Sequence, residues 1–330
     1  MLKFPDGISI VGTGSYVPDK IVSNFDLEKM VDTTDEWITT RTGIQERRIA
    51  QASEAASDLA LKAGSIALKQ AGIAAKEVDL LIVATQSPDY QLPSTAAVIQ
   101  PKLGLKNAVC FDISAACSGA IYALIMAESL MKTCNYNTAM IIGTDVLSKS
   151  VDWSDRSTCV LFGDGAGAIV LKMNIKGRNL ISFDWGSDGS GVDFLKIPAG
   201  GSRNPILASN IDQNQQYLKM DGKKVYKQAT KMMYHSVIRA LNHAKLQKSD
   251  IDFIIPHQAN KRIIEAIAKK LALADDKVMI NIENYGNTSA ASIPIALDEA
   301  ISQGKIKDGD IVVLTAFGAG LTWGSIVIKW

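Results

Sequence analysis

Short, nearly continuous apolar runs alternate along the chain with longer segments in which apolar residues recur every three or four positions. The short runs predict strands buried on both faces, and the longer segments predict amphipathic helices that cover them. Strands are expected at residues 8–12, 78–85, 109–113, 138–144, 168–173, 254–256, 278–282, 311–315 and 325–330. Helices are expected at residues 35–43, 53–71, 95–103, 117–127, 222–244 and 288–302. This alternation predicts a layered α/β protein.

The second part of the chain repeats the first. Ala71 aligns with Ala244 together with the helix end and strand around each, and the strands and helices that follow agree too. Repeated units of this kind indicate a duplicated fold, in which each half is a mixed sheet flanked by helices. We expect the two halves to occupy residues 1–174 and 175–330.

Composition narrows the class of protein. The 330 residues are 47% hydrophobic with a mean hydropathy of +0.09, which is enough apolar material for a large core. A net charge of +1 argues against a general role on nucleic acid or on a membrane surface. The four cysteines lack CxxC and zinc spacings, and the first residues lack a signal-peptide pattern. These features predict a cytoplasmic protein with reduced thiols, no metal site and no membrane span.

One stretch organises the predicted chemistry. The strand at 109–113 ends in small residues and an apolar helix follows at once, so Cys117 is expected at the start of a buried helix. A helix N-terminus carries partial positive charge and free N–H groups, which favour the thiolate and are expected to lower the thiol pKa from about 8.5. Taken alone, Cys117 is better explained as a small buried hydrophobic residue, so the rest of the chain has to decide.

Two further polar residues occur where a predicted strand meets a predicted helix. His257 directly follows a strand, and Asn287 directly precedes a helix. In the repeat, Asn287 falls next to the position that matches Cys117 when Glu128 is aligned with Glu299. Because layered α/β folds place their sites at strand ends along one edge, we expect the cysteine, histidine and asparagine to converge.

These residue types suit acyl transfer. A thiol and an imidazole permit transfer through a thioester on Cys117. His257 and Asn287 can donate hydrogen bonds to an enolate oxygen, which a decarboxylating carbon nucleophile generates. The glycine-rich segment 317–320 offers backbone N–H groups for an oxyanion beside the thiol.

Candidate nucleotide contacts come from a short helix rather than from glycine motifs. Trp37 and Arg41 lie one helical turn apart, so they share a face. One interpretation is an ordinary surface helix. The other is a nucleotide site, in which the aromatic ring contacts a base and the cation contacts a phosphate. Gly12 and Gly14 lack the third glycine of a dinucleotide fingerprint, and residues 163–167 lead into a strand without the Lys-Ser/Thr of a P-loop. We expect residues 163–167 to form a glycine turn.

A long polar segment at residues 186–216, rich in Gly, Ser, Pro and Asn, is expected to be a functional or mobile loop. The helix after it carries a stripe of lysines that includes Lys224 and Lys227. A solvated surface explains such a stripe, although Lys261 and Arg262 extend it into a basic patch suited to an acidic partner.

At these residues the chain closely resembles the 3-oxoacyl-[acyl-carrier-protein] synthase III family. These are the initiating condensing enzymes of bacterial fatty-acid synthesis, and they belong to the thiolase-like superfamily. The resemblance covers essentially the whole chain. It is carried by Asp-Glu-Trp-Ile at 35–38, Arg-Thr-Gly-Ile at 41–44, Ala-Ala-Cys-Ser-Gly at 115–119, Gly-Asp-Gly-Ala at 163–166, Pro-His-Gln-Ala-Asn at 256–260, Gly-Asn-Thr-Ser-Ala-Ala-Ser at 286–292 and Phe-Gly-Ala-Gly at 317–320.

This resemblance implies a duplicated thiolase-like fold, with two mixed sheets and helices in five layers (αβαβα), and usually a homodimer. It implies that Cys117 accepts an acyl group from a CoA thioester, with acetyl-CoA as the expected primer. Malonyl-acyl carrier protein then decarboxylates to an enolate held by His257 and Asn287, which attacks the acyl-cysteine and gives 3-oxoacyl-carrier protein, CO2 and CoA. CoA is a substrate here, and no cofactor is implied.

The resemblance also assigns supporting roles. The backbone N–H groups of Cys117 and Ala319 would form the oxyanion hole. Contacts with CoA are expected from Trp37, Arg41, Arg156, Gly222 and Asn260. The acyl pocket is expected to include Phe317 and Leu92, of which Leu92 resembles a residue that reaches across the dimer. The acidic carrier protein is expected to dock on Lys227, Lys261 and Arg262. The family often has Phe at position 92, so primer size stays open. It often has Gly at position 319, and because the donor there is a backbone N–H, the role is expected to survive.

Other functions share some of these features. A related CoA-dependent condensing enzyme of secondary metabolism, with an unusual primer, would carry the same three residues. A papain-like cysteine protease has cysteine, histidine and asparagine in the same order, but Cys117 lacks that family's flanking motif. A non-catalytic relative would have lost one of the three residues, and none is lost.

Overall fold

The computed structural model describes residues 7–173, 177–208 and 213–330, in which strands and helices alternate as the sequence predicts, although the strand at residues 179–187 is not among those expected. The strands are β1 (Ile8–Tyr16), β2 (Ile21–Ser23), β3 (Glu46–Arg48), β4 (Leu80–Ala84), β5 (Val109–Ile113), β6 (Thr138–Asp145), β7 (Gly165–Met173), β8 (Asn179–Ser187), β9 (Leu195–Lys196), β10 (Lys219–Met220), β11 (Phe253–Pro256), β12 (Ile311–Gly318) and β13 (Thr322–Lys329). The helices are α1 (Asn24–Leu27), α2 (Asp35–Thr42), α3 (Ala56–Ala71), α4 (Thr95–Lys102), α5 (Gly119–Thr133), α7 (Gly222–Ala244), α8 (Lys261–Leu271), α9 (Ile282–Tyr285) and α10 (Ser292–Ser302).

The strands show the same order twice. In the first part of the sheet the order is β5-β4-β6-β7-β1, where β4 is parallel to β5 and β6 while β7 is antiparallel to β6 and β1. In the second part the order is β11-β12-β13-β8, again parallel first and then antiparallel. This repetition agrees with the duplication inferred from the sequence. The two parts join through the pair Ser9 and Asn179 into one nine-stranded sheet, where the sequence predicts two.

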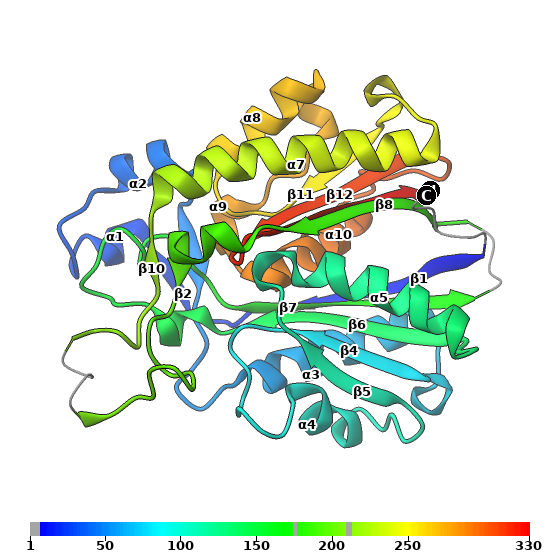
Figure 1. Ribbon diagram of the computed structural model, residues 1–330, viewed down its shortest axis with the longest axis horizontal. Coiled ribbons are helices and arrows are strands. Elements are labelled where there is room, and N and C mark those ends of the chain that lie inside the picture. The colour runs from blue at the N-terminus through cyan, green and yellow to red at the C-terminus, as the bar shows by residue number, and fades with distance from the viewer. Residues whose placement is uncertain (1–6, 174–176, 209–212) are drawn as a thin grey trace.

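The helices lie in layers on both sides of these strands (Figure 1). Helix α3 packs on one face of β1, β6 and β7, and α7 packs on the outer face of β8, β12 and β13. Helices α5 and α10 lie between the two parts of the sheet and contact strands of both. The result is the predicted αβαβα arrangement, with two helices buried at its centre.

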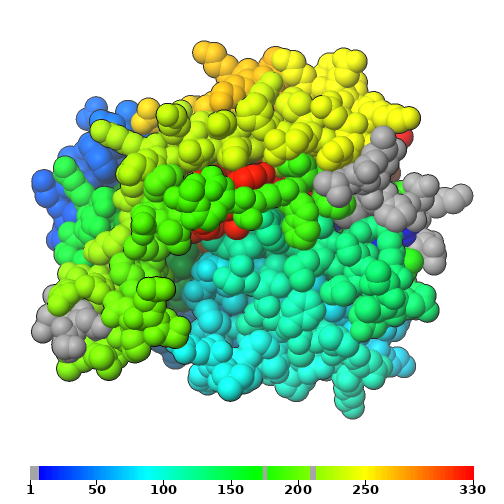
Figure 2. Space-filling view, in the orientation of Figure 1, coloured from blue at the N-terminus to red at the C-terminus, as the bar shows by residue number. Residues whose placement is uncertain are grey.

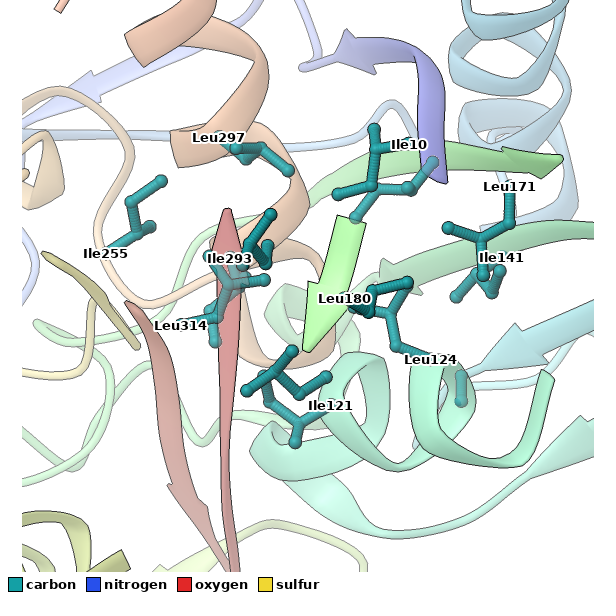
Figure 3. Close-up of a cluster of buried hydrophobic side chains, with 14 of the residues drawn as sticks. Ile10, Ile121, Leu124, Ile141, Leu171, Leu180, Ile255, Ile293, Leu297 and Leu314 are labelled. Atoms are coloured by element: carbon teal, nitrogen blue, oxygen red, sulfur yellow. The ribbon is translucent and has the colours of Figure 1, made fainter. Parts of the chain in front are cut away.

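The central core is apolar because both middle helices are hydrophobic almost all round. Figure 3 shows Ile121 and Leu124 of α5 and Leu297 of α10 beside strand residues of both parts, such as Ile141 and Leu314. All of these side chains are fully buried. A core of this kind fixes the N-termini of α5 and α10, and these ends carry the candidate site.

Three sequence predictions of local structure are wrong in detail. Strand β1 continues past residue 12 to Tyr16. The strand expected at 278–282 is reduced to a single bridge between Ile254 and Val278, because the chain then turns into α9. The glycine turn expected at 163–167 instead lies largely inside β7, where a side chain at Gly167 would meet α10.

The segment expected to be a long loop has structure of its own. Residues 189–194 form a 3-10 helix, and β9 then pairs with β10. Figure 2 shows the region as the green to yellow-green lobe on the left of the molecule. Gln91, from the loop after β4, donates a hydrogen bond to the Gly200 carbonyl at 2.8 Å. Residues 209–212, and the predicted boundary between 174 and 175, lie outside the described residues, so the division into two halves at that point stays a prediction. Within the described ranges, no helix has the length and apolar character needed to cross a membrane.

Candidate active site

Cys117 lies in a tight turn that connects β5 to α5. The 3-10 turn Ala116–Ser118 begins with Ala116 in the left-handed region, at φ 47°. The hydroxyl of Thr322 donates to the Ala115 carbonyl at 2.9 Å, which ties this turn to the start of β13. A Cβ atom at Gly318 would lie 2.7 Å from the Cys117 backbone nitrogen, so only glycine lets the end of β12 pass this closely. The thiol is thereby held at the N-terminus of α5, as the sequence predicts.

A matching turn precedes α10. The 3-10 turn Ser289–Ala291 also begins with a left-handed residue, Ser289 at φ 52°. The position equivalent to Cys117 is therefore Ala290, and the predicted match beside Asn287 is wrong by a few residues. The error arises because pairing Glu128 with Glu299 implies an offset of 171, whereas the two turns are offset by 173, the same offset that aligns Ala71 with Ala244.

Asn287 is positioned by backbone hydrogen bonds to the segment that precedes β7. Its backbone N–H donates to Leu161 at 2.8 Å, and its carbonyl accepts from the Gly163 N–H at 3.1 Å. The side-chain Oδ1 accepts from the Ser289 N–H at 2.9 Å. Since Oδ1 is engaged, the Nδ2 hydrogens are the group that Asn287 offers to a ligand.

His257 follows β11 and is held on both sides. Its backbone N–H donates to the Thr315 carbonyl at 2.8 Å, and Nδ1 lies 2.6 Å from the Ser292 hydroxyl. Burial lowers the pKa of His257 to about 3, so the ring is neutral near pH 7. With Nδ1 engaged by Ser292, Nε2 is the nitrogen that remains for a substrate.

The three predicted catalytic residues line one cavity of about 1010 Å³. Cys117, His257 and Asn287 are only 8%, 2% and 7% exposed, so this end of the cavity is largely shielded from water. Phe317 and Gly318 line it too, and Ala319 follows directly. The convergence expected from the sequence is confirmed.

Most of the predicted CoA contacts line the same cavity, namely Trp37, Arg41, Gly222 and Asn260. Helix α2 presents the first two because Thr34 caps its start, and Gly43, at φ 81°, ends it. Arg156 does not line the cavity, but its guanidinium lies over the Trp37 ring at 5.4 Å and donates to the Asp32 carbonyl at 2.7 Å.

The remaining predicted site residues lie at the surface. Lys227, Lys261 and Arg262 are exposed, and Arg262 also borders the cavity. Leu92 is 88% exposed and does not line the cavity of its own chain. The structure therefore brings Leu92 to no acyl pocket within one chain.

The protonation state expected for the nucleophile is wrong, because Cys117 is a thiol rather than a thiolate near pH 7. Burial raises the pKa of the Cys117 thiol to about 12, although the Ser289 hydroxyl acts in the opposite direction. The loss of water around a buried thiolate outweighs the attraction of a helix N-terminus. Acylation therefore requires a group that takes the thiol proton.

Sequence reasoning missed three polar residues that support the site: Ser289, Ser292 and Asp145. Ser292 contacts His257, and Ser289 lies 3.5 Å from the Cys117 sulfur. Asp145 ends an apolar strand at the edge where the site lies, and this signal was available in the sequence. The two serines do not end a predicted strand. Their roles depend on contacts with His257 and Cys117, which are distant in the sequence.

A buried cysteine before a central helix, with an imidazole and an amide in the same cavity of a duplicated αβαβα fold, defines an acyl-transferring condensing enzyme of the thiolase-like class. Comparison with known proteins gives the family. Residues 111–189 match the model of 3-Oxoacyl-[acyl-carrier-protein (ACP)] synthase III, and residues 241–330 match that of its C-terminal part.

Full-length relatives agree. The Beta-ketoacyl-[acyl-carrier-protein] synthase III of Caldanaerobacter subterraneus subsp. tengcongensis is 54% identical over 321 residues, covering 97% of each chain. The crystal structure of 3-oxoacyl-[acyl-carrier-protein] synthase III from Aquifex aeolicus VF5 superposes with a TM-score of 0.91 at 45% identity, covering 98% of this chain and 100% of that one. The chain belongs to the 3-oxoacyl-[acyl-carrier-protein] synthase III family.

A priming β-ketosynthase from the R1128 polyketide pathway is also similar, with a TM-score of 0.90, but it is only 33% identical, over 98% of this chain and 96% of that one. The alternative of a condensing enzyme of secondary metabolism is therefore not favoured.

Proposed function

We propose that this protein catalyses the initiating condensation of fatty-acid synthesis, in which an acyl-CoA, with acetyl-CoA as the expected primer, and malonyl-acyl carrier protein give 3-oxoacyl-carrier protein, CO2 and CoA. The observation that carries the proposal is that Cys117, His257 and Asn287 share one cavity with Trp37 and Arg41. A thiol nucleophile and a nucleotide-binding surface at the same cavity are what a CoA thioester requires.

In the first half-reaction, the Cys117 sulfur attacks the thioester carbonyl. The backbone N–H groups of Cys117 and Ala319 stabilise the oxyanion that forms, and the close approach of Gly318 to the Cys117 nitrogen supports this arrangement. Collapse of the tetrahedral intermediate expels CoA and leaves an acyl group on Cys117. CoA acts as a substrate, so the reaction needs no further cofactor.

In the second half-reaction, the neutral His257 donates from Nε2 and Asn287 donates from Nδ2 to the thioester oxygen of the malonyl group. Both hydrogen bonds become stronger as decarboxylation turns this oxygen into a negatively charged enolate oxygen. A neutral imidazole suits this role because it remains a donor without placing a buried positive charge. The enolate carbon then attacks the acyl group on Cys117.

CoA would extend from the thiol toward the surface. Trp37 and Arg156 hold the adenine, Arg41 contacts a phosphate, and Gly222 and Asn260 border the pantetheine arm. The position of Arg156 over the Trp37 ring, with a further hydrogen bond to the Asp32 carbonyl, supports a role for this pair in binding a flat ring.

The acidic carrier protein would dock on Lys227, Lys261 and Arg262, which are exposed beside the cavity on α7 and α8. A local basic patch attracts an acidic partner although the net charge of the chain is only +1. Docking there places the malonyl arm at the cavity that holds Cys117.

We further propose a homodimer that forms along β5. This strand is one of the two edges of the nine-stranded sheet, and Val109 on it is 49% exposed. An exposed apolar edge strand favours pairing with a second copy. Leu92 would then reach the acyl pocket of the partner subunit, which accounts for its exposure here. All four cysteines are free, consistent with the proposed cytoplasmic location.

Acylation and decarboxylation test the proposal separately. Labelled acetyl-CoA should acylate Cys117 in the wild-type protein, and Cys117→Ser should lose that label. His257→Ala and Asn287→Ala should still be acylated but should lose most release of CO2 from malonyl-carrier protein. A label that persists in Cys117→Ser, or CO2 release unchanged in both alanine variants, would contradict these roles. A screen of straight and branched acyl-CoAs would then give the primer.

A further inference from the structure

A buried arginine joins two parts of the site without lining the cavity. Arg47 lies on β3, is fully buried, and is not one of the residues that line the cavity of Cys117. Its Nη1 donates to the Val22 carbonyl at 3.0 Å. Its Nη2 donates to Asn24 Oδ1 at 2.9 Å and to the Val160 carbonyl at 3.0 Å. The guanidinium therefore holds three segments of the chain at once.

This position is unfavourable for a charged side chain. Burial lowers the pKa of Arg47 to about 10, so the group is still charged near pH 7. Within the described residues its hydrogen-bond partners are oxygens without formal charge, and its Nε has no partner. A buried charge without an opposite charge beside it is costly. An apolar side chain could fill the space without that cost, but only a planar guanidinium can fix three oxygens relative to one another.

One branch of these contacts leads to the helix that is proposed to bind CoA. Asn24 is fully buried, and its Nδ2 donates to Asp35 Oδ1 and to the Ile44 carbonyl, both at 2.8 Å. Asp35 is the first residue of α2, and Ile44 follows the glycine that ends this helix. Through Asn24, Arg47 therefore positions both ends of α2.

The other branch leads to Asn287. Arg47 binds the carbonyl of Val160. The next residue, Leu161, accepts from the Asn287 N–H at 2.8 Å through its own carbonyl. The stem of Arg47 lies close to the same backbone, because a Cβ atom added at Gly286 would be 3.3 Å from the Arg47 Cβ. Both the head and the stem of the arginine thus support the backbone that orients Asn287.

We propose that Arg47 is a positioning residue that fixes the helix carrying Trp37 relative to the turn carrying Asn287. Helix α2 would contact CoA during acylation, and Asn287 would hold the enolate during condensation, so one buried side chain serves both half-reactions. In the described chain, none of its hydrogen bonds goes to the turn that carries Cys117. This inference rests on the proposed function.

The test compares Arg47→Met and Arg47→Lys with the wild-type protein. Methionine adapts to the space without hydrogen bonds, and lysine keeps the charge but not the planar fork. In both variants the Kd of CoA, measured by titration calorimetry, should rise about tenfold, and the release of CO2 from malonyl-carrier protein should fall about tenfold, because small displacements in an active site have large effects. Alkylation of Cys117 by iodoacetamide should stay within about twofold of wild type, since this small reagent needs neither α2 nor Asn287.

Asn24→Ala separates the two branches. It removes the link to α2 but leaves the bonds of Arg47 to the two carbonyl groups. The Kd of CoA should therefore rise, while CO2 release stays within about threefold of wild type. The matched control is Arg48→Met, which removes the neighbouring arginine, whose guanidinium lies 3.8 Å from Glu46. This variant should change neither quantity.

Several outcomes overturn the proposal. Wild-type values of both quantities in Arg47→Met would do so. Equal losses in CoA binding, CO2 release and alkylation would do so too, because a general loss of structure lowers all three alike. Wild-type behaviour of Arg47→Lys would show that the charge alone is sufficient and would overturn the role of the planar fork.

Two further arms keep the test decisive. If Arg47→Met does not fold, as judged by thermal unfolding, Arg47→Lys and Asn24→Ala carry the same comparison. If the wild-type protein binds CoA but takes no label from acetyl-CoA and releases no CO2, the proposed function fails. The affinity for CoA in the Arg47 and Asn24 variants then still tests whether this arginine positions α2.

Discussion

The contact between Ser292 and His257 permits the sharpest prediction about the second half-reaction. A neutral imidazole has one N–H, and His257 is a useful donor at Nε2 only if Nδ1 is the acceptor. The Ser292 hydroxyl lies 2.6 Å from Nδ1, and when it donates to this nitrogen the ring proton is on Nε2. Ser292→Ala removes this partner inside a fully buried site.

The expected loss can be estimated. A buried polar group left without its partner costs about 1–3 kcal/mol. At about 1.4 kcal/mol per tenfold change, this corresponds to a decrease of about 5- to 150-fold in the release of CO2 from malonyl-carrier protein. Acylation of Cys117 should stay within about threefold of wild type, because His257 takes no part in that step.

The assay measures both half-reactions on the same preparation. Ser182→Ala is the matched control, because it removes an equally buried serine hydroxyl, bonded at 2.7 Å to the Ala240 carbonyl, far from the cavity lining. Ser292→Thr, which keeps the hydroxyl, should restore part of the rate. Equal losses in acylation and decarboxylation, or an unchanged decarboxylation rate, would refute the reasoning.

Three other predictions test separate parts of the site. Gly318→Ala places a Cβ atom 2.7 Å from the Cys117 nitrogen. Acylation should therefore fall at least about tenfold, while malonyl decarboxylation should fall less. Equal losses in the two rates would argue against an oxyanion hole at this position. Lys227→Glu should raise the KM for malonyl-carrier protein about tenfold and leave that for acetyl-CoA unchanged, whereas Lys248→Glu, on a distant turn, should change neither. Because burial lowers the pKa of His257 from 6.5 to about 3, the unfolded chain binds a proton that the folded chain excludes, and stability should fall as the pH drops through that window. Thermal unfolding of His257→Gln should show a smaller decrease over the same range, and an identical decrease would contradict the assignment.

The sequence by itself determined the layered architecture and the position of the nucleophile. Buried strands and amphipathic helices leave their periodicity in the chain, so the main elements, such as α7 at Gly222–Ala244, could be placed closely. The turn before α5 could be recognised for the same reason, since an apolar strand, small residues and an apolar helix follow one another locally. Duplication was visible because both halves keep this order.

Only the tertiary structure decided what surrounds the thiol. The pKa of Cys117 is raised because distant segments remove it from water, and no local pattern reports that burial. The partner of His257 is 35 positions away, and the neighbour of Cys117 at Ser289 is 172 positions away. The true match of the cysteine is Ala290 rather than a residue beside Asn287, and only the matching backbone of the two turns identifies it. Contacts between distant segments depend on how the layers stack, and this stacking is the part of the site that periodicity along the chain does not encode.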